Sequence, residues 1–162
     1  MIVARSTFLP CPFERCLEEV VTSRLLQYVA SPLVVFVPVS PPALPERWEE
    51  QQYVVRLRLF GLIPFGRQTI NISVPSRSDS HIELRDDGYS SLISKWDHLI
   101  TIRSADGGCV YSDRVEVKAG VLTPFVWTFA WLFYRHRQRR WQHLVSSGFE
   151  YKNPNKGMEP TR

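Results

Sequence analysis

Long apolar runs free of proline are missing from this chain, which argues against a transmembrane helix. The stretch that most resembles a span runs from Val121 to Tyr134, has only 14 residues and includes Thr123 and Pro124. A helix crossing the hydrocarbon core needs about 20 apolar residues. The N-terminus alternates and has no run resembling a signal peptide, so we expect a cytoplasmic protein.

Cysteine is also scarce. Cys11, Cys16 and Cys109 are an odd number, none forms a CxxC pair, and the four histidines are not grouped with them. Zinc requires about four ligands at close spacing. We therefore expect no metal site, and three small buried or half-buried thiols in a reducing compartment.

Basic residues are concentrated in one place. Arg135, Arg137, Arg139 and Arg140 equal the whole net charge of +4, so the rest of the chain is neutral. No second basic face is available to follow a phosphate backbone, and nucleic-acid binding is not expected. The chain has no GxSxG nucleophile motif and no phosphate-binding loop, so no cofactor is expected.

Hydrophobic periodicity and turn residues divide the chain into short elements. Proline makes residues 31–47 unsuitable for a central strand, so we expect an extended segment lying against the core. The glycines of Asp86-Asp87-Gly88 and of residues 105–108 predict turns. The expected elements are a strand at 2–8, one helix or a broken pair at 12–29, strands at 53–59, 67–75, 81–85, 90–103 and 109–118, and a helix from Pro124 to Ser147 that ends at Gly148.

Antiparallel hairpins with helices segregated in sequence predict the α+β class. We expect a single domain over residues 1–150, with one antiparallel sheet of about six strands covered on one face by helices. The polar, proline-bearing residues 151–162 are expected to be a disordered tail.

Five segments together resemble the START-like helix-grip superfamily, also called the SRPBCC group, and in particular its small uncharacterised bacterial members. They read SPLVVFVPVSPPALPERW, LFGLIPFGRQTI, KWDHLITI, YSDRVEV and AGVLTPFVWTFAWLFYRHRQRRW. The resemblance covers about residues 1–150. It implies a curved antiparallel sheet that grips the C-terminal helix around an apolar cavity, in a superfamily that contains polyketide cyclases and lipid-transfer domains. No catalytic signature transfers to particular positions here.

The C-terminal helix is expected to have two environments. Its aromatic first half is apolar nearly all round, which favours burial inside the sheet. Its arginine-rich second half is expected to be a solvated surface near the negative end of the helix dipole. Attachment to a membrane interface is a less favoured alternative, as is an acidic partner or a ligand carboxylate for the arginines.

Alternation places four chemically useful side chains on the inner face of the sheet. Trp96 and His98 share a face of residues 90–103, and Tyr111 and Asp113 share a face of residues 109–118. One hypothesis is an acid/base pair of His98 and Asp113, with Tyr111 orienting a ligand oxygen. The alternative is that these are core residues satisfied by their neighbours.

The predicted function is binding of a small apolar or amphipathic molecule between sheet and C-terminal helix. Its candidate contacts are Trp96, His98, Tyr111, Asp113, Phe125 and Phe129, although aromatic residues of this helix could equally fill the core. Two alternatives stay open. One is a cyclase, dehydratase or hydrolase using His98 and Asp113, and the other is a peripheral membrane or protein-interaction module.

Overall fold

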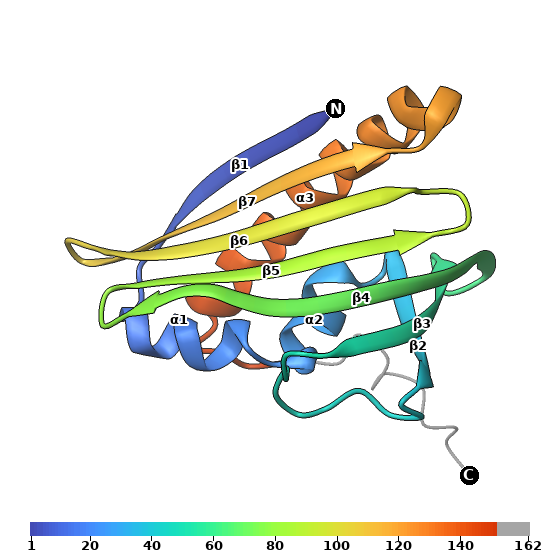
Figure 1. Cartoon of the computed structure of the whole chain (residues 1–162). Coiled ribbons are helices and arrows are strands. Elements are labelled where there is room, and N and C mark those ends of the chain that lie inside the picture. Colours follow the sequence, from blue (N-terminus) through green and yellow to red (C-terminus); the bar gives the residue numbers. More distant parts are fainter. Residues whose placement is uncertain (152–162) are drawn as a thin grey trace, which may run out of the picture.

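A computed structural model describes residues 1–151. A curved, fully antiparallel sheet of seven strands has the order β1-β7-β6-β5-β4-β3-β2, and the helices lie on one of its faces (Figure 1). The predicted α+β helix-grip architecture is therefore confirmed. The strands are β1 (Ile2–Leu9), β2 (Val34–Ser40), β3 (Gln52–Leu59), β4 (Ile63–Ser78), β5 (His81–Ser90), β6 (Lys95–Ala105) and β7 (Gly108–Lys118).

The helical segment after β1 is a broken pair, α1 (Phe13–Val20) and α2 (Ser23–Ala30). Thr22 separates them, because its Oγ1 accepts a hydrogen bond from the backbone N–H of Leu25 at 3.2 Å and so caps α2. After β7 come the short 3₁₀ turn η1 (Gly120–Leu122) and α3 (Thr123–Ser146). Gly148 follows α3 at φ +68°, the left-handed conformation expected of the glycine that ends a helix.

Two details of the strands differ from expectation, and one of them, the turn at residues 86–88, was predicted wrongly. The proline-bearing segment supplies the seventh strand, β2, which pairs with β3 at the edge of the sheet. An edge position tolerates Pro38 because one side of the strand needs no backbone donor.

The expected turn at Asp86-Asp87-Gly88 lies instead inside β5, and the chain turns between β5 and β6. Glycine is required at position 88 because the Cβ atom of any other residue would lie 2.6 Å from the carbonyl oxygen of Thr69 on β4. The glycine therefore permits close strand approach, and the turn comes several residues later.

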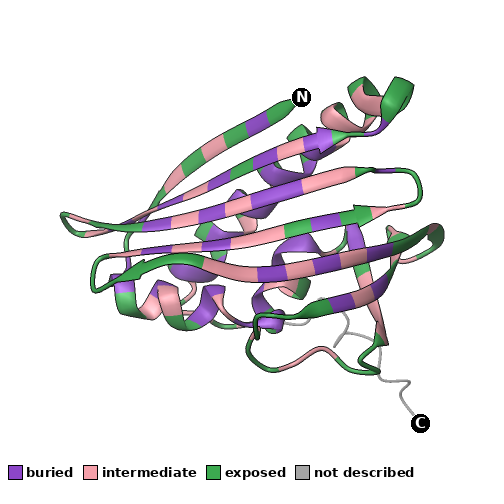
Figure 2. Ribbon diagram, viewed as in Figure 1, coloured by how far each residue is buried: buried purple, intermediate pink, exposed green. Residues whose placement is uncertain are grey.

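The burial of helix α3 differs from expectation in both halves, although Arg135 and Arg139 are exposed as expected. Its first turns are largely exposed, with Phe125 at 75% and Leu132 at 51%, while Arg137 is 6% exposed and Leu144 is fully buried. Figure 2 shows the exposed end of α3 projecting past the sheet. In the second half, Trp141, Leu144 and Val145 belong to a core cluster that also contains residues of α1 and α2.

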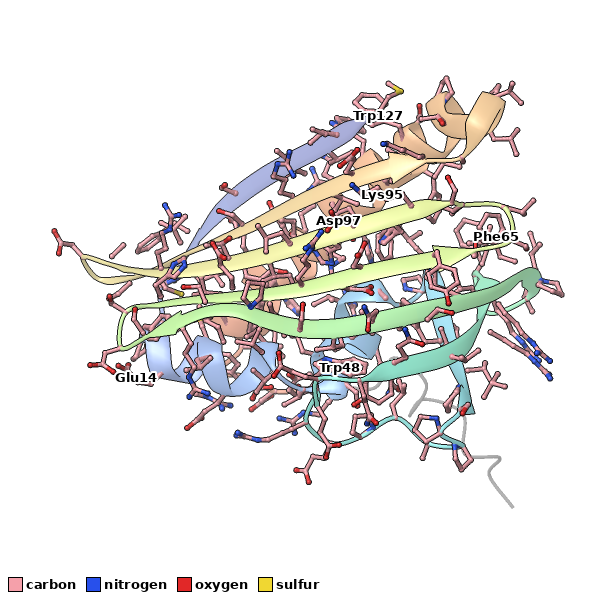
Figure 3. All side chains as sticks on the ribbon, in the orientation of Figure 1. Glu14, Trp48, Phe65, Lys95, Asp97 and Trp127 are labelled. Carbon is pink, nitrogen blue, oxygen red and sulfur yellow. A yellow bond between two sulfur atoms is a disulfide. The ribbon has the colours of Figure 1, made fainter. Side chains whose placement is uncertain are left out.

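One polar contact ties the exposed half of α3 to the sheet. The indole Nε1 of Trp127 donates a hydrogen bond to the backbone oxygen of Ile2 at 2.8 Å, at the start of β1 (Figure 3). Val126 and Phe129 on this half lie toward the sheet interior. The first half of the helix thus presents one face to the cavity and another to solvent.

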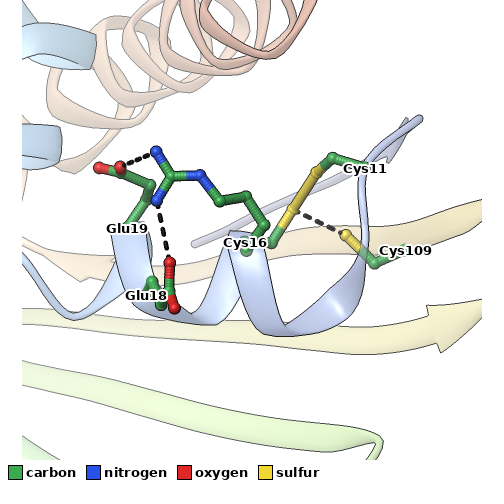
Figure 4. The surroundings of a disulfide bond; sticks show 6 residues. Cys11, Cys16, Glu18, Glu19 and Cys109 are labelled. Carbon is green, nitrogen blue, oxygen red and sulfur yellow. Dashed lines mark hydrogen bonds and ion pairs between the residues drawn. A yellow bond between two sulfur atoms is a disulfide. The ribbon is translucent and has the colours of Figure 1, made fainter. Parts of the chain in front are cut away.

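The cysteines differ from expectation. All three are buried, but Cys11 and Cys16 form a disulfide, so the prediction of three free thiols is wrong for these two (Figure 4). Cys109 is a thiol whose Sγ lies 3.0 Å from that of Cys16. The three sulfur atoms lie within 4.8 Å of one another, a grouping that their sequence spacing did not predict.

The predicted domain boundary at residue 150 stays a prediction. Of the expected disordered tail, residues 152–162 lie outside the described residues. Tyr151 is described, and its hydroxyl donates to the buried carboxylate of Glu19 while its ring lies under the guanidinium of Arg24.

Candidate functional site

A cavity of about 330 Å³ lies between the sheet and α3. Its size is within the range of small-molecule sites in proteins. Most of its wall is apolar and comes from α2, β2, β3, β4, the β5–β6 loop, β6, η1 and α3. The apolar lining residues are Leu26, Val34, Phe36, Leu57, Leu59, Phe65, Ile70, Leu92, Ile93, Trp96, Leu122, Phe125, Val126, Phe129 and Phe133.

The polar part of the lining comes from Gln68, Asp86, His98, Tyr134 and Arg137. Asp86 on β5 stands directly opposite His98 on β6, and Arg137 approaches from α3. Asp86, His98 and Arg137 also line a smaller adjoining space of about 50 Å³. These groups therefore form a polar region against otherwise apolar walls.

Asp113 lies behind His98, away from the cavity, and accepts three hydrogen bonds. Its Oδ1 is 2.8 Å from Nε2 of His98 and 2.8 Å from the hydroxyl of Tyr111. Its Oδ2 accepts from Nε2 of Gln138 at 3.1 Å. Nη2 of Arg137 lies 4.0 Å from Oδ1 and donates to the hydroxyl of Tyr111 at 3.3 Å. Asp113 is thus the anionic centre of a buried network.

The network determines the protonation of its members. Burial alone would raise the pKa of Asp113, but the hydrogen bond from His98 and the charge of Arg137 outweigh it, and the pKa lies below its usual value. Burial lowers the pKa of His98 more than Asp113 raises it, so its ring is neutral at pH 7. Because ionised Asp113 can only accept, we assign the ring proton to Nε2.

This tautomer leaves Nδ1 of His98 unprotonated. Within residues 1–151 Nδ1 makes no hydrogen bond, and the same is true of the side-chain amide of Gln68. The Nε of Arg137 is buried and also has no partner in the described part of the chain. Three polar groups of the lining therefore have unused hydrogen-bonding capacity.

Asp86 is the second acid of the site. Its Oδ1 accepts the backbone N–H of Asn71 at 2.9 Å. Burial raises its pKa to about 7, despite that hydrogen bond and the nearby charge of Arg137. Near neutral pH this carboxyl therefore exists in both protonation states and can either donate to or accept from a neighbour in the cavity.

The six predicted site residues fall into two groups. Trp96, His98, Phe125 and Phe129 line the cavity, with Phe125 at its rim. Tyr111 and Asp113 do not line it, and they contact it only through His98 and Arg137. The contact of His98 with Asp113 is the one that the acid/base hypothesis requires. A role for any of the six in binding stays a prediction.

Sequence reasoning missed Gln68, Asp86 and Arg137. Asp86 was assigned to a turn, although Ile82, Leu84 and Asp86 alternate on the inner face of β5. Arg137 is spaced four residues from both Phe133 and Trp141, and this spacing predicts that its aliphatic stem packs on the apolar stripe of the helix. Its guanidinium, however, was expected in solvent with the other arginines, whereas the whole side chain is buried.

Comparisons with known proteins identify the fold. The model of a family described as Domain of unknown function (DUF8410) matches residues 31–144. No curated protein matches the chain. No helix within residues 1–151 is both long and apolar enough to cross a membrane.

Several solved structures are similar over nearly their whole length. A START superfamily protein from Mycobacterium smegmatis has 14% identity and a TM-score of 0.59, with 90% of this chain and 97% of that chain covered. Protein CV1439 from Chromobacterium violaceum has 15% identity and a TM-score of 0.62, with 89% and 96% covered. TTHA0849 from Thermus thermophilus has 9% identity and a TM-score of 0.62, with 93% and 100% covered. At these identities the likeness concerns the fold alone.

Proposed function

The chain belongs to the DUF8410 family and has the START-like helix-grip fold, and from the cavity of that fold we propose that it binds a small apolar or amphipathic molecule between the sheet and α3. The observation that carries the proposal is an apolar cavity of about 330 Å³ whose lining also contains partly unsatisfied polar groups. Buried polar groups ordinarily have partners. The polar end of a ligand would supply them.

The charges around the cavity favour a ligand whose polar end is neutral. The positive charge of Arg137 is already balanced by Asp113, 4.0 Å away, and Asp86 adds a further partial negative charge. A carboxylate entering this region would meet no net positive charge and would lose its hydration. A hydroxyl can donate to Nδ1 of His98 and accept from Gln68 or Arg137, so an alcohol or phenol fits the available groups.

A fluorescence titration with the neutral probe 1-aminoanthracene tests the proposal. We expect saturable binding, and displacement by 1-decanol at lower concentration than by decanoate at pH 8. Val126→Trp fills part of the cavity from α3 and should abolish binding. Leu132→Trp adds the same side chain on the exposed side of the same helix and should leave binding intact. Equal binding by both variants would exclude the cavity, and stronger displacement by decanoate would contradict the charge argument.

A second candidate, an enzyme of cyclase, dehydratase or hydrolase type, is favoured by the 2.8 Å contact between His98 and Asp113. Asp113 would hold the imidazole with its unprotonated Nδ1 available as a general base toward a cavity-bound substrate. Hydrolysis of p-nitrophenyl butyrate tests the hydrolase form. Activity should be lost in His98→Ala and should fall as pH decreases through the pKa of His98. If the wild-type protein hydrolyses the ester no faster than buffer alone does, a hydrolase activity of this kind is excluded.

The cytoplasmic location also stays a proposal. Two sequence features support it, an N-terminus without a run resembling a signal peptide and the expectation of free thiols. The Cys11–Cys16 disulfide weakens the second, because disulfides persist mainly in oxidising compartments.

A further inference from the structure

Large exposed apolar side chains gather at one end of the molecule. They come from three segments that meet at the right-hand end of Figure 1: the β3–β4 turn, the β5–β6 loop, and η1 with the first turn of α3. We call this set the apolar rim. Its members are Phe60, Leu62, Ile63, Leu92, Val121, Leu122 and Phe125, of which Leu62 is 82% and Val121 is 92% exposed.

The apolar rim surrounds the cavity. Leu92, Leu122 and Phe125 line the cavity while also being exposed, and Phe65, labelled near this end in Figure 3, lines it beside them. Many large apolar side chains exposed at one end of a soluble monomer are uncommon and mark a contact site. Whatever covers this rim would therefore also stand at the cavity opening.

The charges around the rim favour an anionic partner. Residues 59–66, 90–94 and 119–126 carry no charged side chain, and no acidic residue occurs from Gln51 to Ser78. Arg56, Arg58 and Arg67 flank the β3–β4 turn, are exposed, and make no ion pair within the described residues. Apolar tips next to free arginines are the arrangement that binds the headgroup region of an anionic membrane.

We propose that the apolar rim docks on an anionic lipid surface, with its tips among the headgroups and the three arginines at the phosphates. A second copy of the chain would bring these arginines toward one another, which like-charge repulsion opposes. The rim also consists of separate tips around an opening, a shape that a deformable lipid surface can cover. Docking rests on surface residues alone, whereas passage of a ligand between membrane and cavity rests on the proposed function.

Vesicle flotation tests the docking. The wild-type chain should float with phosphatidylcholine vesicles that contain phosphatidylserine, and less with phosphatidylcholine alone or at high salt. Leu62→Ser combined with Val121→Ser should lower the bound fraction at least about tenfold, since two large apolar contacts are lost. Arg58→Glu combined with Arg67→Glu should remove the preference for phosphatidylserine.

A matched control is Phe8→Ser, which removes an exposed aromatic side chain near the C-terminal end of β1, a residue that is not part of the apolar rim. It should float like the wild type. The proposal would be overturned if Phe8→Ser lowered the bound fraction as much as Leu62→Ser with Val121→Ser, or if the wild type floated with neither vesicle. Self-association that Leu62→Ser abolishes, without vesicle binding, would assign the rim to a second copy and would also overturn it.

The aminoanthracene titration separates this proposal from the proposed function. The Leu62→Ser/Val121→Ser variant keeps every cavity-lining residue. It should therefore bind the probe like the wild type while failing to float. Flotation without probe binding in the wild type would leave docking standing and remove the ligand proposal.

Discussion

Asp86→Asn should stabilise the protein, and the gain should grow with pH. The pKa of Asp86 is 3.8 in its ordinary state and about 7 in the folded chain. The folded state therefore binds this proton more tightly than the unfolded state. A carboxyl of this kind contributes stability below pH 3.8 that is lost progressively as pH rises to about 7. Asparagine keeps an oxygen for the backbone N–H of Asn71 but has no proton to lose.

The expected size follows from the same shift. One pKa unit corresponds to about 1.4 kcal/mol, so the complete shift amounts to about 4 kcal/mol. Of this, about 2.5 kcal/mol falls between pH 5 and pH 8 by proton linkage. Because Asp86 is only half-buried, solvent screening lowers part of this cost, and we expect about 1–3 kcal/mol.

Urea denaturation at pH 5 and pH 8 measures this quantity as the difference between variant and wild type. Using the difference cancels the titration of groups that the substitution leaves unchanged. A difference that is constant with pH, or a variant less stable than the wild type at pH 8, would refute the assignment of a raised pKa to Asp86.

Three further predictions test the structure by urea denaturation. Asp113→Asn should cost about 3–5 kcal/mol, because Arg137 then keeps an uncompensated buried charge; a cost below about 1 kcal/mol would mean that this charge is not buried. Gly88→Ala should cost about 1–3 kcal/mol, because its Cβ would meet a carbonyl oxygen of β4 at 2.6 Å, and a neutral effect would contradict that close approach. Leu144→Ala should cost about 2–5 kcal/mol, while Leu132→Ala on the exposed side of α3 should cost under about 1 kcal/mol. A larger cost for Leu132→Ala than for Leu144→Ala would contradict the burial of α3 in this structure.

Local patterns predicted most of the fold because they reflect local physics. Alternation located β1, β3, β6 and β7, and a glycine following a long helical pattern located the end of α3. The edge strand β2 was harder to recognise, because proline excludes a central strand but not an edge strand. Gly88 was misassigned because a glycine needed for close strand packing looks in sequence like a glycine needed for a turn.

The burial of α3 was not predictable from its own composition. Its aromatic half has the residues of a core helix, yet burial depends on which elements lie beside it, and the core cluster that contains residues of α1 and α2 includes α3 residues of the other half only. Arg137 is buried in spite of its charge because Asp113 and Tyr111 are held against it by β7, a contact between residues more than twenty positions apart. Alternation did predict that His98 and Asp113 share the inner face, but not that Asp113 stands behind His98.

The most direct test of the account is to locate a bound molecule within the cavity. Intermolecular NOEs between isotope-labelled protein and unlabelled 1-decanol report which side chains lie beside the alkyl chain. A ligand held between sheet and helix should give NOEs to cavity residues on the sheet and on α3, such as Ile70, Val126 and Phe129. NOEs confined to exposed side chains such as Phe60 and Leu62, with none to Ile70, would show surface adsorption and would contradict a ligand site between sheet and helix.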